Sequence, residues 1–363
     1  MTSASTSPPV TEMAGTTTSY ADHSAPLWRR LLFTREMAII ALTAALVAYA
    51  WLGVENFAGP LTVKYLLQDV APILLIALPM TLVIVTGEID LSVASVMGLS
   101  SVVVGFLFSH GVGMGVAVLA ALVVGVLCGA LNGFLVAYLQ LPSLAVTIGT
   151  LALFRGIAVG LLGTTAVTNF PEGWRELGTG TIGESPIPLV MIPFVLLAIA
   201  FSLLLHFSTF GRGVYDIGLN KEAAHFTGVN VARTKFILFV LCGTVAGLAG
   251  IYFTLRFGTS RGDNATGLEL QVIAAVLLGG VSIFGGTGRL HGVLAGVVLI
   301  GVVASALRLE QINVNATNII IGLLLIASVV VPQVIAAVRT RRGPRKTSRP
   351  NPGAQHGSAA AGV

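Results

Sequence analysis

Charged residues are scarce in this chain: Asp, Glu, Lys and Arg make up 10% of its 363 residues, against roughly a quarter in soluble domains. Hydrophobic residues make up 55%. A water-soluble globular enzyme is excluded, because most of its surface would be apolar. Cysteine is scarce too. Cys128 and Cys242 both lie in apolar runs, and they imply neither a disulfide framework nor a metal site.

The motifs that hold nucleotides, metal ions or catalytic nucleophiles are also absent from the sequence. It contains no G-x-x-x-x-G-K-[ST], H-E-x-x-H, C-x-x-C or G-x-S-x-G. The chain is therefore predicted not to be an enzyme. We expect no catalytic residue, no metal ion and no cofactor on it.

Glycine and long apolar runs are what the sequence has in abundance. It contains 43 glycines, and small residues let membrane helices approach one another closely. A spanning helix needs about 20 mostly apolar residues. We expect an all-α, polytopic transmembrane bundle of about ten spans, at 37–53, 66–86, 93–109, 113–138, 143–162, 187–207, 236–255, 270–285, 290–307 and 316–337.

The distribution of charge predicts how this bundle lies in the membrane. Residues 339–349 hold six basic residues and no acidic one, and the rest of the chain carries 14 basic against 15 acidic residues. Ten spans put both termini in the cytoplasm, together with the basic 208–235 connection. The acidic 163–186 connection then faces outside. This arrangement agrees with the positive-inside rule.

The same patterns divide the chain into three parts. Residues 1–30 are rich in Ser, Thr, Ala and Pro, and we expect a disordered cytoplasmic tail there. Residues 31–338 form the transmembrane domain. Residues 339–363 are expected to form a basic, disordered cytoplasmic tail beside anionic lipid.

The 211–235 segment is the sizeable polar stretch expected on the cytoplasmic face. It predicts a short helix that Asn220 caps and Gly228 ends, with Glu222, Ala223 and Ala224 on it. A short helix with small residues fits closely into a partner's groove. The alternative is a solvated connector between two spans.

Five polar residues within or beside apolar runs are candidates for a solute path. They are Asp90, Ser92, Asn132, Thr147 and Arg155. A charge at membrane depth costs at least about 2.5–3.5 kcal/mol, so it needs a reason. The structural alternatives are a helix-capping turn for Asp90 and Ser92, interhelical hydrogen bonds for Asn132 and Thr147, and outward snorkelling for Arg155.

A glycine-rich segment near 279–292 has two interpretations, close helix packing and an unwound link between helices. Its glycines are Gly279, Gly280, Gly285, Gly286, Gly288 and Gly292. Unwound backbone is tolerated at membrane depth only where protein buries it or a cavity adjoins it. Repeats at four-residue spacing, such as Gly125, Gly129 and Gly133, favour packing.

Several of these strings resemble one family of transport proteins. E-A-A-x-x-x-G at 222–228 looks like the cytoplasmic EAA loop of ABC importer permeases. G-E-I-D-L-S-V-A-S, L-N-G…F-R-G and I-A-A-V-L-L-G-G-V-S-I-F-G-G resemble motifs of sugar permeases. The resemblance covers about 36–338, in order, with departures at Glu88, Ala94 and Gln271. The chain is thus similar to permease subunits of carbohydrate ABC importers of the ribose, rhamnose and autoinducer-2 group, and 257–286 looks most like rhamnose permeases.

The resemblance implies a function and a set of partners. It implies import of a monosaccharide, rhamnose first, with a ribose-like sugar or autoinducer-2 also open, by alternating access in a bacterial cytoplasmic membrane. ATPase subunits would dock at Asn220, Glu222, Ala223, Ala224 and Gly228 and would carry the ATP and Mg²⁺. A second permease subunit, identical or homologous, an extracytoplasmic sugar-binding protein and the lipid bilayer complete the implied partners, with no nucleic acid. The rival is an ion-coupled secondary sugar transporter using Glu88 and Asp90.

Overall fold

The computed structural model describes residues 35–342. The predicted tail at 1–30 lies outside the described residues, as does 343–363. The helix that ends at Arg342 includes the first four residues of the predicted C-terminal tail.

Helices form the regular structure of residues 35–342. They are α2 (Arg35–Gly53), α3 (Pro60–Val85), α4 (Val93–Ser109), α5 (Met114–Ala137), α6 (Ser143–Leu162), α7 (Glu172–Thr179), α8 (Met191–His206), α9 (Thr209–Leu219), α10 (Lys221–Phe226), α11 (Val231–Phe257), α12 (Leu268–Leu278), α13 (Leu290–Leu309) and α14 (Val314–Arg342). Isolated bridges join Val167 to Ser260 and Thr181 to Pro188.

Each of the ten expected segments overlaps one of these helices, but fewer are long enough to span. Six helices meet the length and hydropathy of a span: α2, α3, α5, α6, α11 and α13. A bent pair, α8 and α9, meets them together across a 65° break. The apolar parts of α4, α12 and α14 are shorter than a full span. An all-α membrane bundle is therefore confirmed, whereas the count of ten spans stays a prediction.

Several predicted boundaries are wrong by a turn or more, and two of them affect the site. The segment expected at 270–285 is helical only to Leu278, because the backbone turns left-handed at Gly280, Gly285 and Gly286. The helix expected to begin at 236 begins at Val231, where the Asn230 side chain caps it by accepting a hydrogen bond from the Arg233 amide. Lys235 therefore lies on α11 rather than in a loop.

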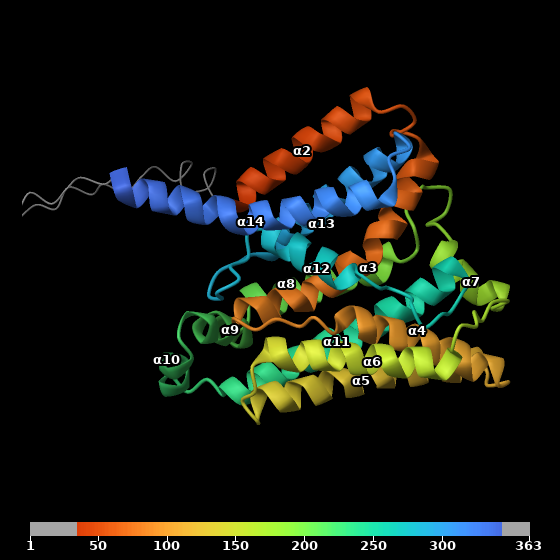
Figure 1. Ribbon diagram of the computed structural model, residues 1–363, viewed down its shortest axis with the longest axis horizontal. Helices are drawn as coiled ribbons and strands as arrows, with labels where there is room; N and C mark the ends of the chain where they lie inside the picture. The colour runs from red at the N-terminus through yellow and green to blue at the C-terminus, as the bar shows by residue number, and fades with distance from the viewer. Residues whose placement is uncertain (1–34, 343–363) are drawn as a thin grey trace, which may run out of the picture.

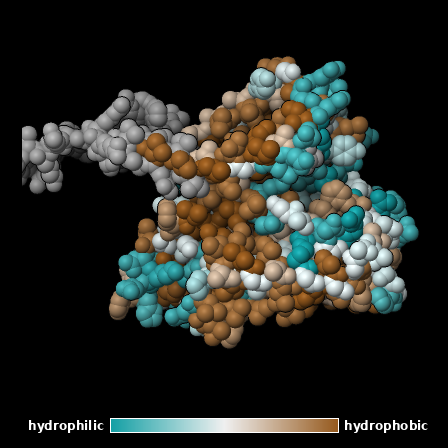
Figure 2. Space-filling model, in the orientation of Figure 1, coloured by the Kyte–Doolittle hydropathy of each residue, from teal (hydrophilic) through white to brown (hydrophobic). Residues whose placement is uncertain are grey.

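The arrangement places the two predicted connections at opposite ends of the bundle. α9 and α10 lie at one end and α7 at the other, with α3 running through the middle (Figure 1). α3 is the most enclosed of the candidate spans, with 94% of its apolar window buried. Hydrophobic residues cover the middle of the visible face and hydrophilic ones gather toward its ends, as a bilayer requires (Figure 2).

Glycines bring α5 and α11 into backbone contact. A Cβ at Gly125 would lie 2.7 Å from the Gly243 carbonyl oxygen, and a Cβ at Gly129 would collide with the Phe239 carbonyl oxygen. The third glycine of the predicted stripe, Gly133, lies against Phe236 of the same helix. The predicted packing face is thus observed, and its partner is α11.

We predict that Gly129→Ala destabilises the protein by about 1–3 kcal/mol, because the new methyl group overpacks a contact between two backbones. The measurement is the midpoint of thermal unfolding of the detergent-solubilised protein. Gly149→Ala on α6 is the matched control, since nothing lies within 4 Å of its Cβ position. Equal midpoints for the two variants would contradict the assigned packing.

Candidate functional site

The short helix α10 is built as the sequence predicted. The Asn220 side chain accepts hydrogen bonds from the amides of Glu222 and Ala223 at 2.9 and 3.0 Å, so it caps the helix. Gly228 follows the helix with a φ of 88°, which favours glycine. Ala224 is buried and faces the protein, whereas Glu222 and Ala223 are exposed. The helix therefore presents a small, partly charged surface at the end of the bundle.

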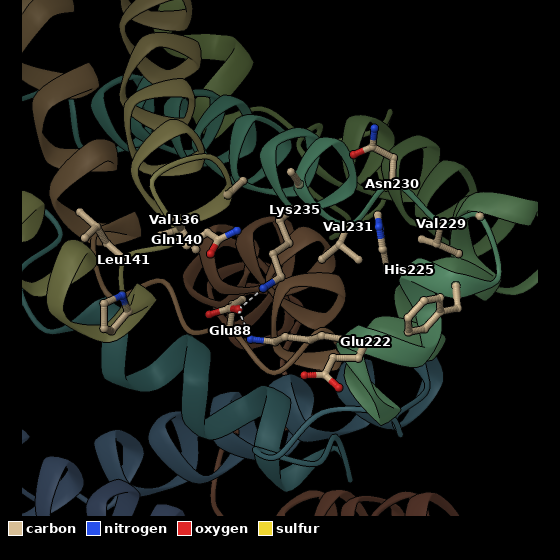
Figure 3. Close-up of a pocket in the computed structure, with 16 residues that line it drawn as sticks. Glu88, Val136, Gln140, Leu141, Glu222, His225, Val229, Asn230, Val231 and Lys235 are labelled. Carbon is tan, nitrogen blue, oxygen red and sulfur yellow. Dashed lines mark hydrogen bonds and ion pairs between the residues drawn. The ribbon is translucent and has the colours of Figure 1, made fainter.

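A cavity of about 1010 Å³ lies beside α10. Its walls come from α10, from the end of α5 and the turn that follows it (136–142), and from the first turns of α11 (Figure 3). Glu88 and Lys235 enter it from the interior, and Glu222, His225 and Asn230 enter it from the exposed side. The cavity thus separates the surface of α10 from the ends of the membrane helices.

Three charged groups meet at this cavity. The Glu88 Oε1 atom accepts hydrogen bonds from Lys235 Nζ at 2.5 Å and from Lys221 Nζ at 3.0 Å. Figure 3 shows the Lys235 side chain pointing toward Glu88. The Glu88 and Lys235 side chains are 9% and 8% exposed, whereas that of Lys221 is 55% exposed. One buried carboxylate therefore joins α10 to α11.

The pKa values of Glu88 and Lys221 are shifted in opposite directions. Burial would raise the pKa of the Glu88 carboxyl, but hydrogen bonds led by that from Lys235 hold this pKa below its usual value. Partial burial would lower the pKa of Lys221, but the Glu88 carboxylate more than offsets it and this pKa lies above its usual value. Both groups are therefore charged at neutral pH, and the pair is ionic.

Three of the five predicted path residues form one hydrogen-bonded chain. Asn132 Nδ2 donates to Ser92 Oγ at 2.7 Å, and Ser92 Oγ donates to Asp90 Oδ1 at 2.7 Å. The Ser92 amide also donates to Asp90 Oδ1, at 2.9 Å. All three side chains are buried, and Asn132 Oδ1 has no partner among the described residues. These hydrogen bonds attach the connection between α3 and α4 to α5.

Thr147 bonds to the α3–α4 connection itself, whereas Arg155 bonds to the first turn of α4 and to the loop after α11. Thr147 Oγ1 donates to the Ile89 carbonyl at 3.2 Å, and the Ile89 amide donates to Ser143 Oγ at 3.2 Å, so α6 also holds the α3–α4 connection. Arg155 Nη1 donates to the carbonyls of Gly262 and Asn264 at 3.0 and 2.6 Å. Arg155 Nη2 also donates to the Ala94 carbonyl of α4 at 3.4 Å, so Arg155 joins the loop between α11 and α12 to the start of α4.

The glycine-rich segment is partly an irregular link and partly a packing face. Gly279, Gly280, Gly285, Gly286 and Gly288 lie between α12 and α13, and Gly292 lies on α13. The Gly286 amide donates to the Val85 carbonyl at 2.8 Å, so the link packs against the end of α3. A Cβ at Gly292 would collide with the Gly279 carbonyl oxygen. Gly288 precedes α13 and so belongs to the irregular link.

The sequence interpretation missed two sets of charged residues. Lys221 and Lys235 were not recognised as partners of Glu88. At the other end of the bundle, Asp69 on α3 accepts from Arg256 on α11 at 2.5 Å and from Arg308 on α13 at 2.6 Å. The sequence signal that could have indicated these ion pairs was a charged residue inside an apolar run, because such a charge needs a partner.

Metal binding has no obvious site in the part of the chain that the structure describes. Within 35–342 no group of three or more His, Cys, Asp or Glu side chains is placed to hold a metal ion. The chemistry that the described residues offer is ion pairing and hydrogen bonding between helices.

Comparison with known proteins identifies the class. Residues 62–329 match the model of a family described as "branched-chain amino acid transport system / permease component". The chain belongs to this family of permeases, and it is a multi-pass membrane protein. No solved structure matches it.

Named relatives narrow the class to one group of importers. The chain is 33% identical over 301 residues to the autoinducer 2 import system permease protein LsrD of Yersinia enterocolitica, covering 81% of this chain and 90% of the relative. It is 34% identical over 318 residues to LsrC of the same organism, covering 85% and 88%. LsrD of Photorhabdus temperata is 35% identical over 262 residues, covering 70% and 78%. These matches confirm the resemblance to ABC importer permeases.

We predict that Ser92→Ala lowers the stability of the protein by about 1–3 kcal/mol, because it leaves the buried Asn132 amide without its acceptor. Thermal unfolding in detergent measures this. Ser109→Ala is the control, since that hydroxyl is exposed and bonds only within its own helix and to the neighbouring His110. A Ser92→Ala variant as stable as the control would show that the buried chain contributes nothing.

Proposed function

We propose that this chain is the transmembrane permease subunit of an ABC importer that moves a monosaccharide across a bacterial cytoplasmic membrane. The observation that carries the proposal is α10, a capped helix with small and acidic residues, exposed at the end of a membrane bundle. Family membership and the relatives' role as import permeases support it. Hydrolysis of ATP, with its Mg²⁺, is assigned to a partner chain.

The identity of the solute is a finer proposal. The resemblance of residues 257–286 to rhamnose permeases favours rhamnose. The names of the relatives favour autoinducer-2, and a ribose-like sugar fits the same group. We place rhamnose first and treat the other two as alternatives that an uptake assay separates.

The proposed mechanism is alternating access. A binding protein delivers the solute at the end of the bundle that carries α7. Two permease subunits form the path between them, and two ATPase subunits bind the α10 helices at the other end. Closure of the ATPase subunits on ATP then moves α10 and changes which end of the path is open. Asp90, Ser92, Asn132, Thr147 and Arg155 remain the proposed path residues. In the described conformation Asp90, Ser92, Asn132 and Thr147 are buried, and their exposure requires the helices to move.

An ion-coupled carrier is the rival function. The two carboxylates that it would use to bind an ion already have partners within the protein. Glu88 is paired with two lysines, and Asp90 with Ser92. Uptake that collapses with a protonophore while ATP is held constant would favour this rival. Uptake that follows the ATP supply supports the importer.

The direct test is affinity purification of the tagged chain from its host in mild detergent, with bound proteins identified by mass spectrometry. We expect an ATPase subunit and a solute-binding protein, and ATP-dependent uptake of L-rhamnose, D-ribose or autoinducer-2 when they are reconstituted together. Recovery of the chain alone, even after cross-linking, would contradict the proposal.

The double variant Glu222→Lys, Gly228→Asp is predicted to lose the ATPase subunit and to reduce uptake to background. The first change reverses the charge at the exposed position 222 of α10, and the second places a side chain where φ is 88°. Membrane insertion, measured by the amount of folded chain, stays normal. Glu184→Lys makes the same charge change at the other end and is expected to retain the ATPase subunit. A double variant that still binds it would refute the assigned docking surface.

A further inference from the structure

We propose that Glu88 is a positioning residue, which transmits the movement of α10 to the membrane helices through its ion pairs with Lys221 and Lys235. This inference rests on the proposed docking of an ATPase subunit on α10. It goes beyond that proposal by naming the connection between the docking surface and the transmembrane core.

The first support is where the three charges come from. Lys221 is the first residue of α10, Lys235 lies on α11, and Glu88 lies in the connection between α3 and α4. Lys221 and Lys235 lie 133 and 147 residues after Glu88 in the sequence. Among the residues the structure describes, Lys221 provides the ion pair that joins α10 to another element. Movement of α10 therefore acts directly on a group between α3 and α4.

The second support is the burial of the acceptor. Glu88 and Lys235 are both almost fully buried in the described conformation, so each charge is stabilised mainly by its protein partners. Separating a buried charge from its partner is strongly unfavourable, so the pairing is expected to persist. Because Lys221 is half exposed, it can follow α10 while it keeps its contact with the buried carboxylate.

The third support is what is attached to Glu88. The next residue, Ile89, is held to α6 by hydrogen bonds with Ser143 and Thr147. Asp90 is held through Ser92 to Asn132 on α5. A displacement of Glu88 is thus passed within two residues to α5 and α6, which carry three of the proposed path residues.

The fourth support is the glycine-rich link on the other side of the same connection. The Cβ of a side chain at Gly285 would lie 2.9 Å from the Gly87 amide nitrogen, and the Gly286 amide is bonded to the Val85 carbonyl. The link leads into α12 and α13. Because of the backbone contact at these glycines, a movement of residues 85–88 also acts on α12 and α13.

The experiment measures coupling rather than activity alone. The importer is reconstituted in proteoliposomes with its ATPase subunits and binding protein. Uptake and ATP hydrolysis are measured in the same vesicles, using whichever of L-rhamnose, D-ribose and autoinducer-2 the wild-type importer takes up. The result is the ratio of solute imported to ATP hydrolysed. We expect Lys221→Met to lower this ratio about tenfold and Lys221→Arg to preserve most of it, because arginine keeps the charge.

Arg233→Met is the matched control. Arg233 is exposed near the same end of α11, and no ion pair with a described residue involves it, so the ratio is expected to equal that of the wild type. The amount of ATPase subunit bound to each variant is measured in parallel. Weak docking lowers uptake and ATP hydrolysis together, so their ratio stays the same. Loss of transmission lowers uptake relative to ATP hydrolysis, so the ratio falls.

A second pair of variants tests whether the two groups act through each other. The double variant Glu88→Gln, Lys221→Met is expected to lower the ratio no further than Glu88→Gln alone does, because Lys221 then has no carboxylate to pair with. A Lys221→Met importer with the wild-type ratio, or losses that multiply in the double variant, would overturn the inference while the proposed function stands. A wild-type chain that binds no ATPase subunit would overturn both.

Discussion

The Glu88 carboxylate is the group on which the arrangement of one end of this molecule depends. It pairs with two lysines that belong to different helices, and the Glu88 and Lys235 side chains are almost fully buried. Without it, Lys235 would be a buried, unpaired cation at the start of α11, and α10 would lose its ion pair to the bundle. This pairing links the position of α10 to the helices of the bundle.

The remainder of the bundle is held by contacts that need few charges. α5 and α11 approach through glycines until backbone meets backbone, which is how helices pack where no hydrophobic effect drives them together. At the end opposite to Glu88, Asp69 joins α3 to Arg256 and Arg308. A small number of ion pairs therefore joins the helices at both ends, and close glycine packing fills the middle.

Much of the fold could be predicted from the sequence because a bilayer leaves few alternatives to a helix. Each apolar run became a helix, and the capped helix at Asn220 and the glycine stripe on α5 are as expected. Other features could not be predicted. The pairing of Glu88 with Lys235 spans 147 residues, and hydropathy carries no information about which distant charges meet. The end of α12 at Leu278 depends on left-handed backbone at later glycines, which a count of apolar residues does not detect. The burial of Asp90, Ser92 and Asn132 likewise depends on helix packing.

The proposed role of α10 is to form the surface on which an ATP-hydrolysing partner acts. It is tested most directly by site-specific cross-linking in native membranes. Cys128 and Cys242 are both buried, so a cysteine placed at the exposed position 222 can be labelled selectively with a photoactivatable reagent. We predict a covalent product with an ATPase subunit from position 222 and none from a cysteine placed at position 184, at the opposite end. Cross-linking of the ATPase subunit from position 184 and not from position 222 would contradict the account.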